Sequence, residues 1–541
     1  MSARSAAVGA AASLVLLTLG AGQFLMTLDS SVMNVSMATV ANDLDTPITG
    51  IQTAITMYTL VMATLMITGG KIGSNIGRRR AFAIGCVIYA IGSFITGLAQ
   101  NLATLLIGWS LLEGIGAALI MPAIVSLVAG NFEAKDRPRA YGLIAAAGAI
   151  AVALGPLIGG AATTYFSWRW VFFSESIIVA IILLLSRRIA EAPVESKKPL
   201  DFVGTLLSVM GLGLAVFGVL RTSEWGWINP KTGGPALFGL SPSFWLIIGG
   251  SIIVWLFFLW EQRVLANGKE PLVRADIFAF RQLNGGLIMF FFQFLLQSGV
   301  FFVIPLFLSV VLELSAIDTG IRLMPLSIAL LLAAVAIPKV WPDASPRRVV
   351  RAGVILMLLG ILALLSGIDL YSTAAVVAVP LALLGLGMGA LASQLGSVTV
   401  SAVPDERSGE VGGLQNTATN LGASLGTALA GSVLIAVLTG SLIAGIQAND
   451  QVPASVQDQA GVELASGVPF LSDTDLRSAM SDAGASTAVT NAVVMENQAA
   501  RIQGMDAALG VLALIAVASL LFTSRMPEVQ PGSVEATQVA A

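Results

Sequence analysis

Fourteen long apolar stretches make up most of this chain, and each is about as long as a helix that crosses a lipid bilayer. The hydrocarbon core is ~30 Å thick, so a helix needs about 20 consecutive apolar residues to cross it. Runs of this length exclude the short, alternating strands of a membrane barrel. The sequence therefore predicts an all-α membrane protein with spans near residues 12–38, 51–70, 81–98, 102–128, 140–163, 170–186, 203–221, 242–260, 283–311, 319–338, 350–368, 373–397, 411–440 and 505–523.

Composition excludes several classes of function. Apolar residues are 56% and charged residues 11%, and a soluble domain has roughly 25% charged residues. Histidine is absent, which removes the commonest metal ligand and the usual base at neutral pH. The single cysteine, Cys86, allows no disulfide within the chain. We predict no metal, no cofactor and no nucleic-acid partner.

The basic residues predict an orientation. Most of the 28 Lys and Arg fall into loops on one side of the predicted spans. Only six fall on or near the other side, namely Arg169, Arg221, Lys231, Arg322, Arg477 and Arg501. Because Lys and Arg concentrate in cytoplasmic loops, we expect both termini in the cytoplasm.

The spans fall into a pattern of six, two and six, which predicts four segments. Residues 1–190 form an N-terminal six-helix half, and residues 191–281 form a linker with two extra spans. Residues 282–527 form the C-terminal half, including an acidic external loop at 441–504 that we expect to be partly helical. Residues 528–541 form a cytoplasmic tail. Doubling of this kind is typical of transporters built from repeats, although an irregular bundle would give the same count.

Acidic residues lie inside apolar spans of the N-terminal half. Asp29 lies in the first span, with Asn34 on a neighbouring face, and Glu113 lies in the fourth, followed by Gly114. A charge at this depth costs at least about 2.5–3.5 kcal/mol, so such residues are usually functional. Glu175 lies in the outer half of the sixth span, where we expect it near the water interface.

Glycines mark two further places. Gly70 and Gly77 flank a turn between the second and third spans, followed by Arg78 and Arg79; an ordinary basic inside loop gives the same pattern. In the fifth span, four small or bend-forming residues predict close helix contact with a bend, which serves as a gating hinge or as plain packing. They are Gly155, Pro156, Gly159 and Gly160.

The C-terminal half supplies candidate cavity residues. Gln293 and Gln297 lie one turn apart with Phe294 between them, a combination that suits flat apolar or cationic ligands. Lipid-facing phenylalanines are the alternative interpretation. Asn416 and Asn420 belong to a polar stripe in the thirteenth span, which indicates helix contact or a water-lined path.

Five segments together resemble the major facilitator superfamily, and specifically its fourteen-span drug:proton antiporter family. They lie in the expected order and on the expected spans: Leu28 to Ala38, Gly69 to Arg80, Ser110 to Leu119, Gly155 to Gly160 and Trp168 to Phe173. The resemblance covers nearly the whole chain. It implies the major facilitator fold, with two six-helix halves plus two inserted helices.

The chain departs from the family pattern at four positions. Ser74 stands where an acid is usual, and Asn75 where a basic residue is usual. Ser110 replaces a usual arginine, and Glu113 a usual glutamine. The proton-coupling roles of the fourth span therefore do not transfer unchanged.

The resemblance implies proton-coupled efflux of hydrophobic or cationic drugs by a monomer in the plasma (cell) membrane. Asp29 and Glu113 would line a central cavity and carry protons or attract substrate, with Glu175 as a further candidate. Export of an endogenous lipid or metabolite is the nearest alternative. A membrane enzyme or a receptor is the alternative of another class, but the sequence has no phosphate-binding loop and no cytoplasmic or external catalytic cluster of acids.

Overall fold

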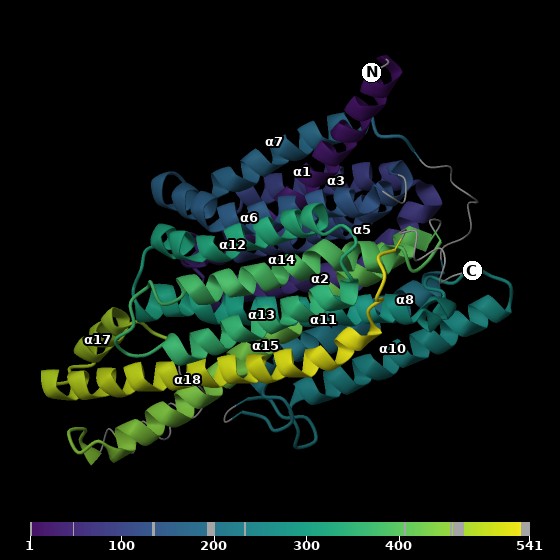
Figure 1. The fold of residues 1–541 in the computed structure, drawn as a ribbon. Helices are drawn as coiled ribbons and strands as arrows, with labels where there is room; N and C mark the ends of the chain where they lie inside the picture. The colour runs from purple at the N-terminus through teal and green to yellow at the C-terminus, as the bar shows by residue number, and fades with distance from the viewer. Residues whose placement is uncertain are drawn as a thin grey trace.

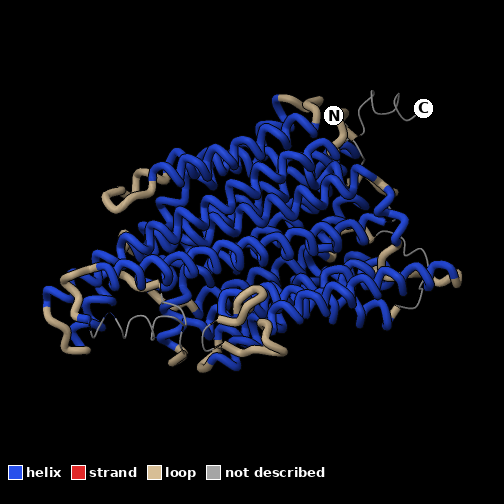
Figure 2. Tube along the Cα trace, turned by 90° about the horizontal axis from the view of Figure 1, so that it is seen from below, coloured by secondary structure: helices blue, strands red, loops and turns tan. Residues whose placement is uncertain are grey.

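The structure, a computed structural model, describes residues 3–46, 48–132, 136–191, 201–231, 234–404, 407–454, 457 and 470–531. Within these residues the regular elements are helices, apart from one isolated bridge between Leu237 and Leu240 (Figure 2). Fourteen helical segments among them are long and apolar enough to cross a membrane. The predicted all-α membrane fold is confirmed.

The helices of the first part of the chain are α1 (Ala3–Asp43), α2 (Ile48–Ile76), α3 (Arg78–Gly97), α4 (Leu102–Leu105), η1 (Leu106–Glu113), α5 (Gly114–Asn131), α6 (Arg137–Tyr165) and α7 (Arg169–Ser186). The middle part has α8 (Phe202–Leu220), the short α9 (Thr222–Trp225) and α10 (Pro242–Ala266). The last part has η2 (Ala275–Ala279), α11 (Arg281–Leu306), η3 (Phe307–Val311), α12 (Ala316–Val340), α13 (Pro346–Gly367), α14 (Ala378–Val400), α15 (Ser408–Ala448), α17 (Asp473–Asp482), α18 (Thr487–Phe522) and η6 (Thr523–Arg525).

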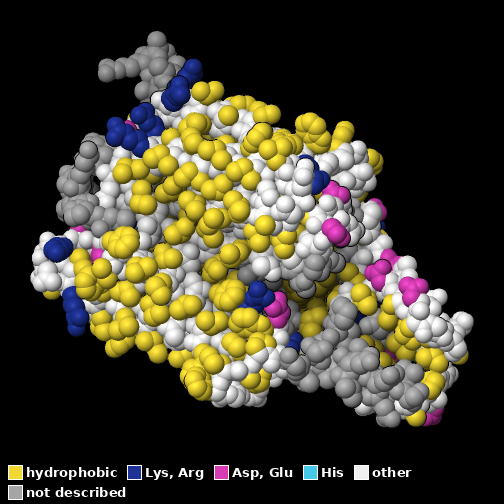
Figure 3. Space-filling model, turned by 180° about the vertical axis from the view of Figure 1, so that it is seen from behind, with side chains coloured by type: hydrophobic (Ala, Val, Ile, Leu, Met, Phe, Trp, Pro, Cys, Tyr) yellow, Lys and Arg dark blue, Asp and Glu magenta, His cyan; other side chains and the backbone are white. Residues whose placement is uncertain are grey.

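The long helices run side by side along one common direction, and both ends of the described chain lie at the same end of the bundle (Figure 1). Apolar side chains cover the middle of the face in Figure 3, with Lys and Arg mainly at one end and Asp and Glu at the other. We call these the basic end, where both ends of the described chain lie, and the acidic end, where α17 lies (Figure 1).

Two separate apolar cores hold the bundle together. One is built from buried side chains between residues 15 and 189, and the other from buried side chains between residues 289 and 526. A smaller cluster joins α8 and α10 side chains to both parts at the basic end, with Phe257 and Ile67 among its members. Each half therefore has its own core.

Two helices are much longer than the predicted spans. Helix α15 has 41 residues, about 60 Å at 1.5 Å per residue, and α18 has 36. Both continue beyond the acidic end, where α17 lies beside α18 (Figure 1). Arg501 of α18 is buried and donates to the carbonyl of Leu471 at 2.7 Å, and it pairs with Asp473. The described part of segment 441–504 is thus largely helical.

The expected loop between the second and third spans is almost entirely helical. Helix α2 ends at Ile76 and α3 begins at Arg78, which leaves only Gly77 between them. Gly77 has φ of 105°, a conformation that side chains rarely adopt. A Cβ added there would also lie 3.0 Å from the Glu191 carboxylate. A single glycine therefore makes this turn.

Candidate functional site

Three carboxylates from distant parts of the chain meet inside the N-terminal half. Asp29 of α1, Glu113 of η1 and Glu175 of α7 each place one oxygen within 4.8 Å of the others. All three side chains are 0% exposed. The expectation that the Glu175 side chain lies near water is therefore wrong. In this conformation the three acids are enclosed by protein and do not line an open central cavity. We call these three residues the acid trio.

Each member of the acid trio accepts hydrogen bonds from its own donor. The indole Nε1 of Trp109 donates to both oxygens of Asp29, at 2.9 and 3.0 Å. The hydroxyl of Thr96 donates to Glu113 at 3.0 Å, and that of Ser93 donates to Glu175 at 3.1 Å. The donors come from α3 and η1, so these two elements position the trio.

The trio has spare hydrogen-bonding capacity and no counter-charge. Glu113 Oε2 and Glu175 Oε1 are buried and have no hydrogen-bond partner. The hydroxyls of Tyr58 and Tyr89 are also buried without a partner. In the part of the chain that the structure describes, no ion pair includes a member of the trio. The oxygens are close enough to share protons or a hard metal ion.

A π-helical segment sets the direction of Glu113. Residues Leu106–Glu113 form η1, between α4 and α5, and such segments are frequent at functional sites. Glycines let α3 approach it: a Cβ on Gly92 would lie 2.8 Å from Glu113 Cγ, and one on Gly108 would lie 2.7 Å from Thr96 Oγ1. No sequence pattern predicted the π-helical segment.

Ser110, in place of the usual family arginine, makes a helix contact instead of a charge contact. It is buried, and its hydroxyl donates to the carbonyl of Ala54 on α2 at 2.8 Å. At the acidic end, Arg169 pairs with Asp43 at 2.7 Å, and Trp168 donates to the same carboxylate at 3.0 Å. These contacts join α1 and α7 at that end.

The fifth-span glycines contact α1. A Cβ on Gly155 would overlap Ser31, and one on Gly159 would lie 3.0 Å from Val32 Cα. Gly160 is buried as well. The glycines therefore allow close packing within the N-terminal half, and a hinge role stays a prediction. The side chains of Asn34 and Pro156 lie outside the described residues.

The candidate cavity residues of the C-terminal half do not join the acid trio. Gln293 is buried with an unpartnered Oε1, whereas Gln297 and Phe294 are half-buried. Asn416 donates to the carbonyl of Gly412 at 2.8 Å, and Asn420 donates to that of Asn416 at 2.8 Å. Asn420 also contacts Met66 of α2 at 3.6 Å. This stripe therefore meets the N-terminal half at α2.

The remaining motif residues lie at the basic end or beside the trio. Arg78 donates to the carbonyl of Ser126 at 3.0 Å. Arg79 pairs with Glu191 at 3.7 Å. Gly70 is buried, and a Cβ on Gly114 would lie 2.9 Å from a Val61 methyl group.

Sequence reasoning missed a buried ion cluster that joins the two halves. Lys71 of α2 is 4% exposed and lies 2.8 Å from Glu270, which follows α10. It also lies 3.6 Å from Glu410 of α15. Lys71 thus links the N-terminal half, the inserted helices and the C-terminal half at the basic end. The signal that could have found it was a lysine directly after Gly70, at the end of an apolar run.

Comparison with known proteins agrees with this architecture. Residues 19–427 match the family model of the Major Facilitator Superfamily. The human organic anion transporter MFSD10 has a similar fold, with a TM-score of 0.56 and 14% sequence identity over 97% of this chain and 100% of the other. At this identity the likeness shows the fold alone.

Curated relatives include resistance proteins. The multidrug resistance protein Stp of Mycobacterium tuberculosis is 27% identical over 79% of this chain and 77% of its own length. The puromycin resistance protein of Streptomyces alboniger is 29% identical over 81% and 84%. The riboflavin transporter RibZ of Clostridioides difficile is 28% identical over 79% and 89%. The chain therefore belongs to the major facilitator superfamily, and is a multi-pass membrane transporter related to drug-resistance exporters.

Proposed function

We propose that this transporter exports hydrophobic or cationic drugs in exchange for protons across the plasma membrane. The observation that carries the proposal is the acid trio, three buried carboxylates with no counter-charge. The resistance relatives support efflux of drugs. The riboflavin transporter RibZ shows that a relative also carries a metabolite, and export of an endogenous lipid or metabolite is our alternative.

Charge repulsion explains why the trio suits proton exchange. At 4.8 Å and an effective dielectric constant of ~20, two negative charges repel by about 3.5 kcal/mol. Three such pairs cannot persist without a counter-charge, so the enclosed trio holds protons in our proposal. Opening the bundle toward water or toward a cationic substrate would release them. An acid that holds either a proton or the substrate couples the two by exclusion.

Enclosure also limits what the trio can bind in this conformation. Its members are 0% exposed, so an organic substrate has no room beside them. In our proposal the substrate binds after rearrangement, in a cavity that includes residues such as Gln293 and Phe294.

The two apolar cores support the proposed six, two and six division of the spans. The basic end is cytoplasmic in the proposal, and the transporter acts as a monomer.

Efflux from inverted vesicles with a proton-gradient dye tests this function. A panel of lipophilic cations and neutral drugs identifies the substrate class. We expect Asp29→Asn to abolish proton-driven efflux while the protein remains inserted, and Glu113→Gln to weaken efflux of cations more than of neutral compounds. Glu496→Gln, a carboxylate change on α18, is the matched control. Full proton-coupled efflux in the triple variant Asp29→Asn, Glu113→Gln, Glu175→Gln would refute the proposal.

A further inference from the structure

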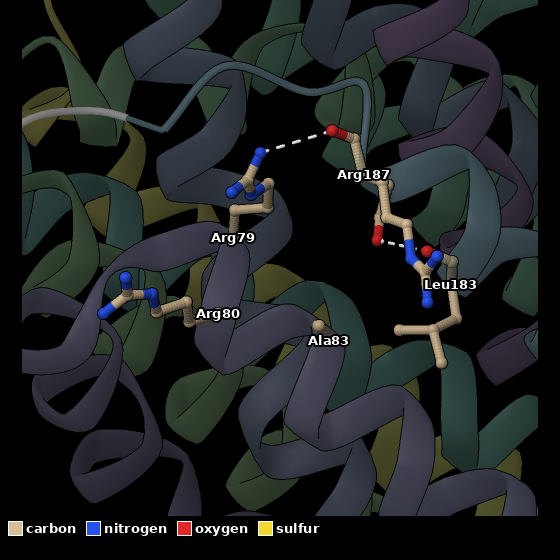
Figure 4. Close-up of a pocket in the computed structure, with 6 residues that line it drawn as sticks. Arg79, Arg80, Ala83, Leu183 and Arg187 are labelled. Atoms are coloured by element: carbon tan, nitrogen blue, oxygen red, sulfur yellow. Dashed lines mark hydrogen bonds between the residues drawn. The ribbon is translucent and has the colours of Figure 1, made fainter.

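A second site lies at the basic end, where the first turn of α3 meets the last turn of α7. A pocket there is lined by Arg79, Arg80, Ala83, Leu183, Ser186 and Arg187 (Figure 4). Figure 4 shows Arg79 and Arg80 on one side, Leu183 and Arg187 on the other, and Ala83 between them. The pocket is thus basic at its rim and partly apolar in its wall.

The three arginines are not equivalent. Arg79 is held in place, because its guanidinium donates to the carbonyls of Ile189 at 3.1 Å and Arg187 at 3.3 Å and lies 3.7 Å from Glu191. Arg80 and Arg187 are exposed. Among the described residues, no hydrogen bond or ion pair is formed by either of their guanidinium groups. Two guanidinium groups therefore remain available beside the pocket.

An apolar track leads from the pocket along the outer face of the bundle. On α3, Ile84, Val87 and Ile91 are 46%, 42% and 51% exposed, and their spacing of three and four places them on one helix face. On α7, Leu184 and Ile181 are 57% and 51% exposed. In a multi-pass membrane protein, such exposed apolar stripes face lipid chains.

We propose that this pocket binds the phosphate headgroup of an anionic glycerophospholipid, whose acyl chains lie along the α3 and α7 track. Guanidinium groups bind phosphate in a forked, charge-assisted geometry, and basic pockets between spanning helices bind anionic headgroups. A zwitterionic lipid would place its own cation against Arg80 and Arg187. A free phosphate would leave the apolar track unused. The inference is independent of proton coupling.

Native mass spectrometry of the full chain tests the site, with phosphatidylglycerol and phosphatidylcholine as probes. We compare the double variant Arg80→Gln, Arg187→Gln with the matched control Arg263→Gln, Arg348→Gln, which removes two exposed arginines outside the pocket. We expect the pocket variant to bind phosphatidylglycerol at least tenfold more weakly, and the control to bind as the unmodified chain does. Size-exclusion profiles verify that both variants remain folded.

Three outcomes would overturn the proposal. Equal loss in the two double variants would show a general effect of surface charge. Equal binding of phosphatidylcholine would show that the headgroup charge is not recognised. Equal binding of soluble glycerol phosphate, with competition against phosphatidylglycerol, would show a free-anion site and not a lipid site.

Discussion

Replacing Lys71 by methionine should loosen the contact between the two halves at the basic end. The change keeps most of the length of the side chain but removes the positive charge beside Glu270 and Glu410. Lys71 and Glu410 are 4% and 8% exposed, whereas Glu270 is 29% exposed. Removing one partner of a buried pair costs about 3–5 kcal/mol. Because water partly solvates Glu270 and reduces its penalty, we expect a cost of about 3 kcal/mol, at the lower end of this range.

This cost falls only on the conformation in which the halves meet at the basic end. A change of ~3 kcal/mol shifts an equilibrium by about 100-fold. A conformation open at the basic end that is populated at ~1% in the unmodified chain would therefore become about as common as the closed one. We expect the variant to populate both.

Spin-label distances between the two halves measure this shift. Labels at Arg139→Cys of α6 and Arg348→Cys of α13 report on exposed positions at the basic end. The only natural cysteine, Cys86, is buried, and Cys86→Ser removes it as a labelling site. We expect a second, longer distance in the Lys71→Met variant.

A double-mutant cycle separates the ion pair from other effects. Adding Glu410→Gln to Lys71→Met removes the more buried of the two uncompensated carboxylates and leaves only the partly solvated Glu270, so we expect the shorter distance to recover in part. A distance distribution in the Lys71→Met variant identical to that of the unmodified chain would refute the reasoning.

Three further changes test other contacts. Gly159→Leu should impair transport but not insertion, because its side chain would clash with α1, and normal transport would count against the contact. Arg501→Gln should release the segment around Asp473 from α18, so that limited proteolysis cleaves this segment faster. An unchanged cleavage rate would contradict the proposed role of the Arg501 contact. Hydrogen bonds from the backbone and hydroxyl of Thr474 hold the pKa of the Glu313 carboxyl below its ordinary value. The contact between Glu313 and Thr474 should therefore be intact above about pH 4.3, the ordinary pKa of a glutamate. It should be lost as the pH falls through the lowered pKa. The amide protection factor of Thr474 measures it, and protection that is constant with pH would rule it out.

The sequence allowed the fold to be predicted because the bilayer limits the choice so strongly. Each span needs about 20 apolar residues, and the runs have that length. The ends of the elements were less accessible. Helices α15 and α18 continue beyond their apolar runs, through polar sequence that includes Asn497 and Gln498 of α18. Hydropathy detects where a helix leaves lipid, and not where the helix ends.

Candidate residues could be selected from the sequence, but their grouping could not. Asp29, Glu113 and Glu175 stood out as acids in apolar runs, yet they belong to three helices far apart in the chain. The direction of Glu113 also depends on the π-helical segment η1, where one additional residue per turn changes which face the following side chains occupy. Lys71 was visible only as a basic residue near a loop, because its partners lie about 200 and 340 residues away.

The positions of the acid trio and of the ion cluster raise the question of how one could influence the other. The trio lies within the N-terminal half, and Lys71 joins the halves at the basic end. Helix α6 contacts both halves. Its glycines contact α1 at Ser31 and Val32, within one turn of Asp29, and the same helix packs against α12 and α14 of the C-terminal half.

A change of charge at Asp29 would alter the packing of α1, and the tight contact with α6 leaves little space to absorb the movement. In the proposed proton exchange, we therefore expect α6 to transmit proton release to the interface between the halves. This route predicts that Gly159→Leu changes the spin-label distances at the basic end even though residue 159 contacts α1 and not the C-terminal half. A distance distribution unaffected by that variant would remove α6 as the connection, and would leave direct contacts of α2 with α15 as the remaining route.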